Sequence, residues 1–233
     1  TNDSKLLNQN SDSYQLTNYD SARSSGNISS SLLLNSSINA GSIAITAAND
    51  FTNLAANITT SKNILADGST SSGDLNILTG NNINIQTLQL HNRSESHWGN
   101  KKNGGDIIID KVTNLQSSLN IAGNLNSDSL NDTTLQAAKI AIGTSGDESS
   151  GNININAGNN LLLLTAQDTD LLSISIRKNK TFTFKNTDHG HSNSTVLNNQ
   201  ITSTSNNPLS LTSQNIAYAE YKSGTENSLN IQS

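Results

Sequence analysis

The stretches GDLNILTGNNINI (residues 73–85) and GNININAGNNLLL (residues 151–163) repeat one pattern, in which the glycines, the aliphatic residues and the Asn-Asn pairs coincide. In both, a glycine precedes a run that alternates between aliphatic and other residues, and Gly-Asn-Asn precedes a second such run. Alternation with a period of two is typical of β-strands. Glycine and asparagine tolerate the left-handed backbone conformations found at tight corners. The repeat therefore predicts short strands joined by corners.

The same frame accepts further segments of the chain. Gly41, Gly73 and Gly105 follow one another at intervals of 32 residues, and the next anchor, Gly151, follows after 46. The sequence therefore predicts a repeat that absorbs one insertion. The additional segments that fit the frame are Gly41–Phe51, Gly105–Ile109, Leu119–Ile121, Lys139–Ile142, Leu209–Leu211 and Leu229–Ile231.

The composition restricts the architectures that such strands can form. Asn, Ser and Thr make up 97 of the 233 residues, 32% of the residues are hydrophobic and 3% are aromatic, whereas ordinary globular domains contain roughly 45–50% apolar residues. A parallel β-helix needs only a thin aliphatic column, because each circuit pairs with its neighbours about 4.8 Å away and polar residues form ladders outside. We therefore expect an all-β protein with a parallel β-helix (solenoid), of about ten circuits and about 50 Å in length.

A β-sandwich is the competing architecture, since it also uses short alternating strands. It would not produce near-identical Leu-Asn-Ile and Ile-Asn-Ile triplets after glycine, and its core would need more aromatic residues. The β-helix frame also predicts which side chains point inward. These are Ile43, Ile45, Leu75, Ile77, Ile107, Ile109, Ile153, Ile155, Leu209 and Leu211.

Several classes of protein are disfavoured by what the sequence contains. Without cysteine there is no disulfide framework and no thiolate metal site. A net charge of −5 with scattered lysines gives no electrostatic footprint for nucleic acid. No run approaches the ~18 apolar residues of a membrane span, and Thr1–Asn10 lacks the pattern of a signal peptide. We interpret the sequence as a fragment of a longer chain.

One family resemblance is visible in the best-preserved repeat. Gly151–Leu161, running into Leu164-Thr165-Ala166-Gln167-Asp168-Thr169 and a lysine-rich excursion, resembles the haemagglutinin repeat of the filamentous haemagglutinin family. These are large two-partner-secretion exoproteins, including adhesins and the stalks of contact-dependent growth inhibition toxins. The resemblance covers the chain well from Gly41 onward and weakly before Gly26.

The resemblance implies a right-handed parallel β-helix and a secreted protein on the bacterial cell surface, outside the outer membrane. It implies export by an outer-membrane two-partner-secretion transporter, and a role in virulence through attachment to a receptor or glycan on a target or host cell, or through toxin delivery. Neither an amino-terminal secretion domain nor a toxin domain is recognisable. We therefore expect residues 1–233 to form a single β-helix segment of a larger protein.

The first break in the repeat lies near residues 91–103. His91, Glu95 and His97 are residue types that can bind a divalent metal, but such a site needs a preorganised geometry that spacing cannot show. We interpret the segment as a solvated excursion capped by a half-buried Trp98, with contact to a partner as the alternative. We predict no metal site here.

The second break lies near residues 177–193, and its Thr-Phe-Thr-Phe alternation predicts a projecting β-ribbon. Phe182 and Phe184 would share one face, and Lys178, Lys180 and Lys185 would be available to acidic groups such as lipid headgroups or glycans. Alternatively, the phenylalanines pack the ribbon onto the side of the solenoid. His189-Gly190-His191 resembles a metal-binding pair only superficially.

Catalytic motifs are not found in the sequence. There is no Gly-x-Ser-x-Gly elbow, phosphate-binding loop or HExxH motif. Asp50, Asp74, Asp106 and Asp168 are spread among predicted corners, as expected of turn residues. We therefore expect a structural and adhesive stalk segment, not an enzyme and without a cofactor. The alternative is a carbohydrate-active β-helix enzyme or a glycan-binding module.

Overall fold

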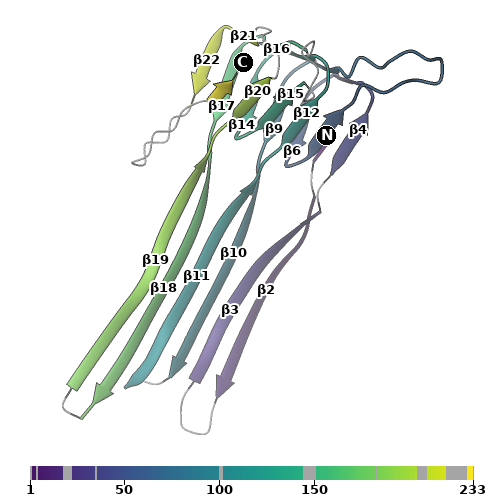
Figure 1. Ribbon diagram of the computed structural model, residues 1–233. Coiled ribbons are helices and arrows are strands. Elements are labelled where there is room, and N and C mark those ends of the chain that lie inside the picture. Colours follow the sequence, from purple (N-terminus) through teal and green to yellow (C-terminus); the bar gives the residue numbers. More distant parts are fainter. Residues whose placement is uncertain are drawn as a thin grey trace.

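The computed structural model contains only β-strands among the residues that it describes, and the strands form four sheets (Figure 1). The described residues are 2–3, 5–17, 23–34, 36–99, 102–143, 151–181, 183–203, 209–218 and 230–232. Three sheets are parallel and together form a compact body, which we call the stack. The fourth sheet is antiparallel and projects from the stack.

Each parallel sheet is built from short strands that come from successive parts of the chain. The first sheet contains β5 (Ile43–Ala47), β8 (Leu75–Thr79), β13 (Leu125–Ser129), β16 (Ile153–Ala157) and β21 (Leu209–Thr212). The second contains β1 (Asn2–Asp3), β6 (Phe51–Leu54), β9 (Ile83–Gln86), β14 (Thr133–Gln136), β17 (Asn160–Leu164) and β22 (Asn215–Tyr218). The third contains β4 (Ser37–Ala40), β7 (Asn57–Thr60), β12 (Ser118–Ile121), β15 (Lys139–Ile142), β20 (Gln200–Ser203) and β23 (Asn230–Gln232).

The chain visits these sheets in a fixed order, first, second, third and then first again. Equivalent strands of successive circuits pair in register, so that Leu125 lies opposite Leu75 on one side and Ile153 on the other. The described chain is thus an all-β protein with parallel sheets of stacked strands, an arrangement consistent with a β-solenoid.

The Asn-Asn and Asn-Asp pairs of the repeat form a ladder at the corner between the first and second sheets. Oδ1 of Asp50 accepts a hydrogen bond from the backbone N of Asn82 (2.9 Å), and Oδ1 of Asn82 accepts one from the backbone N of Asp132 (3.1 Å). Oδ1 of Asp132 then accepts hydrogen bonds from the backbone N of Asn160 and from Nδ2 of Asn159, both at 3.0 Å. The corner side chains therefore satisfy backbone donors of the next circuit.

Inside the stack, aliphatic side chains form columns as the repeat predicts. The prediction is confirmed for Leu75, Ile77, Ile153 and Ile155, which are all buried. Ile43, Ile45, Leu209 and Leu211 are partly buried and pack against the same cluster. The predicted polar ladder is also present outside, where Nδ2 of Asn126 donates to Oδ1 of Asn76 (2.8 Å) and Nδ2 of Asn154 donates to Oδ1 of Asn126 (2.9 Å).

The antiparallel sheet, which we call the hairpin sheet, consists of three long hairpins side by side (Figure 1). Their strands are β2 (Lys5–Thr17) and β3 (Arg23–Leu34), β10 (Leu88–Gly99) and β11 (Asn103–Leu115), and β18 (Ala166–Lys180) and β19 (Thr183–Leu197). Neighbouring hairpins pair through β3 with β10 and through β11 with β18. The hairpins extend beyond both excursions predicted from the sequence, and the first hairpin lies in the segment with the weakest repeat.

The hairpins are inserted in every second circuit, between the second and the third sheet. They follow β1, β9 and β17, whereas β6 passes directly to β7 and β14 passes directly to β15. A hairpin is two strands wide, and each circuit raises the stack by one strand spacing of about 4.8 Å. Insertion in alternate circuits therefore gives the hairpins the spacing at which they pair edge to edge.

The direct passages require sharp corners, and their backbone shows it. Ala55 and Ala137 have φ angles of 48° and 45°, in the left-handed region that side chains rarely adopt. Each begins an Ala-Ala pair, and all four alanines are buried. The methyl side chain of alanine fits into this buried corner. Both positions nevertheless hold a backbone conformation that is strained for a residue with a side chain.

Where a hairpin returns to the stack, a buried polar side chain closes the gap between the second and third sheets. Oδ1 of Asn199 accepts a hydrogen bond from the backbone N of Ala138 (2.8 Å), and its Nδ2 donates to the carbonyl oxygens of Leu135 (3.0 Å) and Leu164 (3.1 Å). Ser117 occupies the equivalent position after the second hairpin. Both side chains add hydrogen bonds to carbonyls where a hairpin departs, beside those that Leu164 and Gln86 accept from the Ala137 and Ala55 backbone N.

The predicted repeat unit Gly105–Ile109 is wrong, because these residues lie in β11 of the hairpin sheet and Ile109 is 45% exposed. The place assigned to it in the stack is taken by Leu125–Ser129 of β13. A strand of an exposed sheet alternates with the same period as a strand of the stack. In β13, Ser127 and Ser129 occupy inward positions, so this strand lacks the alternating aliphatic residues of the repeat.

Two further predictions need correction. Among the described residues each parallel sheet contains five or six strands, not about ten, because the hairpins and loops use much of the chain. Asp50 and Asp74 lie at corners as predicted, but Asp106 lies within β11 and Asp168 within β18.

Candidate contact surface

The hairpin sheet is a single layer, so each of its strands presents side chains on two faces. β10, β11, β18 and β19 pair in register, and directly opposite residues share a face. Trp98, Gly105 and Ile176 form one such row, and we call their side of the sheet the tryptophan face. The other side, which carries Arg93 and Arg177, is the arginine face. From the row of Trp98 to the row of Leu172, the large apolar residues of this face on β10, β11 and β18 are Trp98, Ile107, Ile109, Leu172, Ile174 and Ile176.

Trp98 lies across the neighbouring strand at a glycine. A Cβ atom at Gly105 would lie 2.4 Å from Cζ2 of Trp98 and 2.6 Å from the carbonyl oxygen of Ser175, so no other residue fits there without movement. Packing of an aromatic ring over a cross-strand glycine is a known way to stabilise such a pair. Trp98 remains 36% exposed, which agrees with the half-buried position predicted for it.

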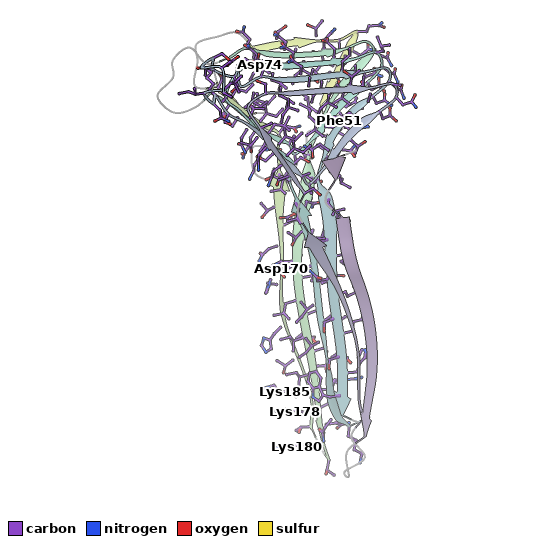
Figure 2. All side chains as sticks on the ribbon, turned by 90° about the vertical axis from the view of Figure 1, so that its right-hand side faces the viewer. Phe51, Asp74, Asp170, Lys178, Lys180 and Lys185 are labelled. Carbon is purple, nitrogen blue, oxygen red and sulfur yellow. The ribbon has the colours of Figure 1, made fainter. Side chains whose placement is uncertain are left out.

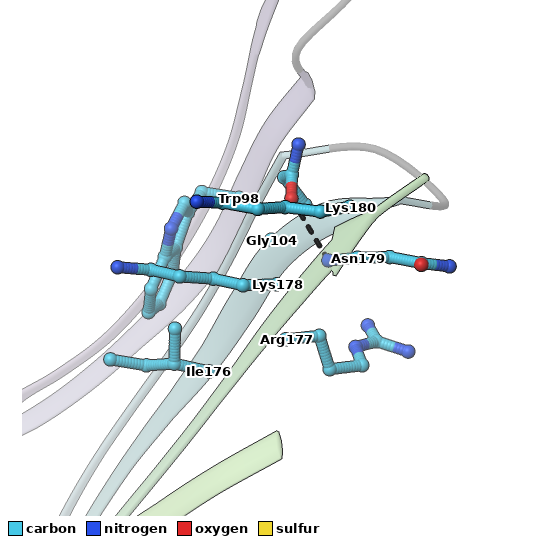
Figure 3. Close-up of a pocket in the computed structure, with 8 residues that line it drawn as sticks. Trp98, Gly104, Ile176, Arg177, Lys178, Asn179 and Lys180 are labelled. Carbon is cyan, nitrogen blue, oxygen red and sulfur yellow. Dashed lines mark hydrogen bonds between the residues drawn. The ribbon is translucent and has the colours of Figure 1, made fainter. Parts of the chain in front are cut away.

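The predicted lysines gather near the tip of the hairpin sheet, the end farthest from the stack (Figure 2). Lys178 and Lys185 lie directly opposite each other, and Lys180 follows on the same face. Figure 3 shows Trp98, Ile176 and Lys178 on one side of the sheet and Arg177 and Asn179 on the other. A groove of about 420 Å³ lies here, lined by Trp98, Ile176, Lys178 and Lys180 among others.

Phe184 lies on the opposite face from the three lysines and is 68% exposed. The alternative in which the phenylalanines pack the ribbon onto the stack is therefore wrong for Phe184. Phe182 lies outside the described residues. The structure thus places Trp98 with the lysines, across the sheet from Phe184.

The arginine face carries a network of ion pairs and not a metal centre. Nε2 of His91 lies 2.6 Å from Oδ1 of Asp110, and Arg93 bonds to both Asp110 and Glu95. Nδ1 of His97 lies 2.6 Å from Oδ1 of Asp106. His91 and His97 therefore each contact a different aspartate. In the described part of the chain, no group of three or more His, Cys, Asp or Glu residues is arranged to hold a metal ion.

Asp110 is the best-connected carboxylate of this network. Its pKa is lowered from the ordinary value, first by the hydrogen bond with His91 and also by the hydrogen bond from Arg93, although partial burial opposes the shift. The carboxylate therefore stabilises the folded sheet while it is ionised.

A second, smaller hollow of about 80 Å³ lies on the tryptophan face at the base of the hairpin sheet, near the stack. Asp168 and Asp170 line it together with Lys111. Oδ1 of Asp168 accepts hydrogen bonds from the backbone N (2.6 Å) and Nδ2 (3.0 Å) of Asn114, which ties the second hairpin to the third. Asp170 is more accessible, with its side chain 48% exposed and 3.9 Å from Nε2 of His191.

The sequence interpretation did not separate the two faces. The tryptophan face becomes visible when every second residue of β18 is considered, because Asp170, Leu172, Ile174, Ile176 and Lys178 then form one series. That signal was present in the sequence. The pairing of β18 with β11, which sets Trp98 beside this series, was not.

Comparisons of the chain with protein-family models, with curated proteins and with solved structures gave no match. No helix among the described residues is long and apolar enough to cross a membrane. The functional interpretation therefore depends on the geometry of the hairpin sheet and of the stack that carries it.

Proposed function

We propose that the chain is a structural and adhesive stalk segment of a secreted bacterial cell-surface exoprotein, and that its stack is a right-handed parallel β-helix. The in-register pairing of strands such as β8, β13 and β16 supports the β-helix. Crossover connections between parallel strands of one sheet are almost always right-handed, which supports the handedness. The segment acts by rigidity and surface contacts, as an adhesin or a toxin-delivery filament.

The observation that carries this proposal is the projection of the hairpin sheet from the stack (Figures 1 and 2). A rigid body of stacked strands holds a long sheet outward, and the far end of that sheet presents Lys178, Lys180, Lys185 and the 68% exposed Phe184. Aromatic residues such as Phe184 are enriched at contact sites, and the lysines on the other face can attract acidic groups. The contact is with a receptor or glycan on a target or host cell.

The remaining parts of the proposal concern the longer protein. It is exported by an outer-membrane two-partner-secretion transporter and stays on the cell surface, and it performs no catalysis in this segment. The repeat and its asparagine ladders support a role as a spacer, since stacked circuits extend a filament by adding similar units.

Binding of the purified chain to target cells tests the adhesive role. Lysine contacts with acidic groups are screened beyond about 8 Å at physiological salt and over shorter distances as salt rises, so we expect binding to weaken markedly toward about 0.5 M salt. Phe184→Ala and the triple variant Lys178→Ala/Lys180→Ala/Lys185→Ala should each reduce binding. Leu78→Ala is the matched control, because Leu78 is a 52% exposed apolar side chain on the stack. Equal binding by all variants would reject the tip as the contact, and no binding by the wild type would reject adhesion by this segment.

A further inference from the structure

The side chains of β18 on the tryptophan face follow a self-complementary order. From the base to the tip they are Asp168, Asp170, Leu172, Ile174, Ile176, Lys178 and Lys180. Ile174 is the centre of this series. Reversal of the strand about Ile174 exchanges Asp170 with Lys178 and Leu172 with Ile176, so that each carboxylate takes the place of an ammonium and apolar residues stay apolar.

From this order we infer that the tryptophan face docks against the tryptophan face of a second copy of this chain, with the two hairpin sheets head to tail. In this arrangement a twofold axis lies between the sheets and crosses the strands at the level of Ile174. Asp170 of each copy faces Lys178 of the other, and the apolar residues between them face each other. Such an isologous contact is the commonest way in which identical chains associate.

The charges select the head-to-tail arrangement over the parallel one. If the two faces met with their strands in the same direction, the lysine-bearing tips of both copies would lie together at the same level, and like charges across an interface are strongly unfavourable. Head to tail, Lys185 faces Asn193 and Lys111 faces Asn103, which are neutral. The two hollows of this face also correspond, because the one at the base contains Asp170 and the one at the tip contains Lys178.

The apolar centre of the face provides a reason to associate. Ile109 is 45% exposed and Trp98 is 36% exposed, and the strands of the hairpin sheet contact chiefly one another. In the head-to-tail pair, Trp98 of one copy lies over the row of Ser94 and Ile109 of the other. Burial of such a contiguous apolar strip is the usual driving force of association.

The dimensions of the sheet fit this contact. β18 has 15 residues from Ala166 to Lys180, so its middle is Ser173, one residue from the centre of the charge pattern. The tip of each sheet therefore reaches the base of the other. Four strands of this length cover roughly 50 Å by 19 Å, about 950 Å² on each copy, which is enough for the roughly 800 Å² per partner of a standard interface.

Association changes which tip residues stay available to a target surface. Trp98, Lys178, Lys180 and Lys185 turn toward the second copy, so the lysine contact with a target surface belongs to the monomer, whereas Phe184 and the arginine face remain outside. The inference does not depend on the proposed adhesive function, because it concerns contact between copies of this chain alone.

Light scattering coupled to size-exclusion chromatography and sedimentation equilibrium of the purified chain test the inference. We expect a species of twice 24.6 kDa, with its proportion rising between about 1 and 100 µM. Asp170→Lys should raise the dimer dissociation constant at least about tenfold, because it sets two cations against each other. The exchanged variant Asp170→Lys/Lys178→Asp should restore the dimer, since the pairs are re-formed with opposite sign.

A pair of adjacent leucines supplies the control for the apolar contact. Leu172 lies on the tryptophan face, and Leu171 lies on the arginine face with 36% exposure. Leu172→Ser should yield a monomer with unchanged circular dichroism, and Leu171→Ser should stay dimeric. A monomeric wild type overturns the inference, as does a dimer that survives Leu172→Ser or is not rescued by the exchange. Cell binding by the monomeric Leu172→Ser variant would separate adhesion from association.

Discussion

The stack and the hairpin sheet use strands of the same alternating pattern and bury them to very different extents. In the stack, Ile77 and Ile155 are each 2% exposed, because three sheets surround a common column of side chains. In the hairpin sheet, Ile109 and Leu171 are 45% and 36% exposed, because a single layer can cover neither of its faces. Alternation in the sequence thus predicts a strand but not what its apolar side meets.

The two regions also differ in what holds successive units together. In the stack, polar side chains at corners bond to the backbone of the next circuit, as Asp132 does with Asn160 (3.0 Å). In the hairpin sheet, backbone pairing along strands of 12 to 15 residues joins the hairpins, for example β11 with β18. We therefore expect substitutions to have large effects on folding in the stack and on association in the hairpin sheet.

Two adjacent residues of β8 test this difference most severely. Ile77→Asp places a charge between stacked aliphatic side chains and should cost several kcal/mol of unfolding free energy. Leu78→Asp makes the same chemical change at a position that is 52% exposed, and should stay within about 1 kcal/mol. Thermal or urea denaturation followed by circular dichroism measures both.

Milder variants keep this test readable if Ile77→Asp does not fold. Ile77→Ala should cost about 2–4 kcal/mol, whereas Ile109→Ala in the hairpin sheet should cost less than about 1 kcal/mol, because Ile109 is already 45% exposed. Equal losses in the two regions would contradict the distinction between a buried column and an exposed layer.

The junction between the regions gives the next largest effect. Asn199→Ala removes the hydrogen-bond partner of the Ala138 backbone N and one hydrogen bond each from the Leu135 and Leu164 carbonyls, of which Leu164 keeps the bond from the Ala137 backbone N. An unpaired buried donor costs about 1–3 kcal/mol, so we expect a loss of about 1–3 kcal/mol, chiefly from the Ala138 N–H. Gln200→Ala, at the exposed neighbouring position, is the control and should be close to neutral. A small effect of Asn199→Ala would mean that the hairpin, and not the Asn199 side chain, joins the second and third sheets.

Much of the stack could be predicted from the sequence, because its pattern is local. The glycine, the alternating aliphatic residues and the Asn-Asn pair mark one strand, one corner and the next strand, as in residues 73–85. The pattern failed where a serine replaces an aliphatic residue, as at Ser127. It failed in the opposite direction at Gly105–Ile109, where a strand of the hairpin sheet imitates a repeat unit.

The contact surface could be predicted only in part, because it is made by pairing between distant hairpins. The second break of the repeat indicated Lys178, Lys180, Lys185 and Phe184 as contact residues. The first break indicated Trp98. Nothing local to Trp98 indicates that its ring lies across Gly105, or that Gly105 pairs with Ile176 of another hairpin. The insertion of hairpins in alternate circuits, which allows that pairing, is a property of the whole stack.

The serine that interrupts the column gives a prediction of opposite sign. Ser127 is 3% exposed, lies between Ile77 and Ile155 in the first sheet, and its hydroxyl has no hydrogen-bond partner. Ser127→Ala removes the buried unpaired hydroxyl and should stabilise the protein by about 1 kcal/mol. Ser117→Ala is the contrast, since the Ser117 hydroxyl lies 2.7 Å from the carbonyl oxygen of Gln86 and its loss should destabilise. Denaturation midpoints that move in the same direction for both serines would show that burial of the hydroxyl, and not its pairing, decides the effect.

The smallest expected effect concerns the ion pairs of the hairpin sheet. The pKa of Asp110 is lowered in the folded protein, chiefly by the hydrogen bond with His91 and also by Arg93. Its contribution to stability is therefore fully present above the ordinary pKa of 3.8 and is lost as the pH falls through the lower value of the folded state. Since His91 and Arg93 are 51% and 41% exposed, solvent screening should keep the contribution below about 1 kcal/mol. Asp110→Asn should accordingly lower the melting temperature slightly at about pH 6 and have no effect at about pH 2. The control is Asp188→Asn, at an exposed position on the same face. It should leave the melting temperature unchanged at about pH 6. A pH-independent loss in Asp110→Asn would assign its role to packing instead of charge, and the hairpin sheet would then depend on buried contacts more than its exposed single layer indicates.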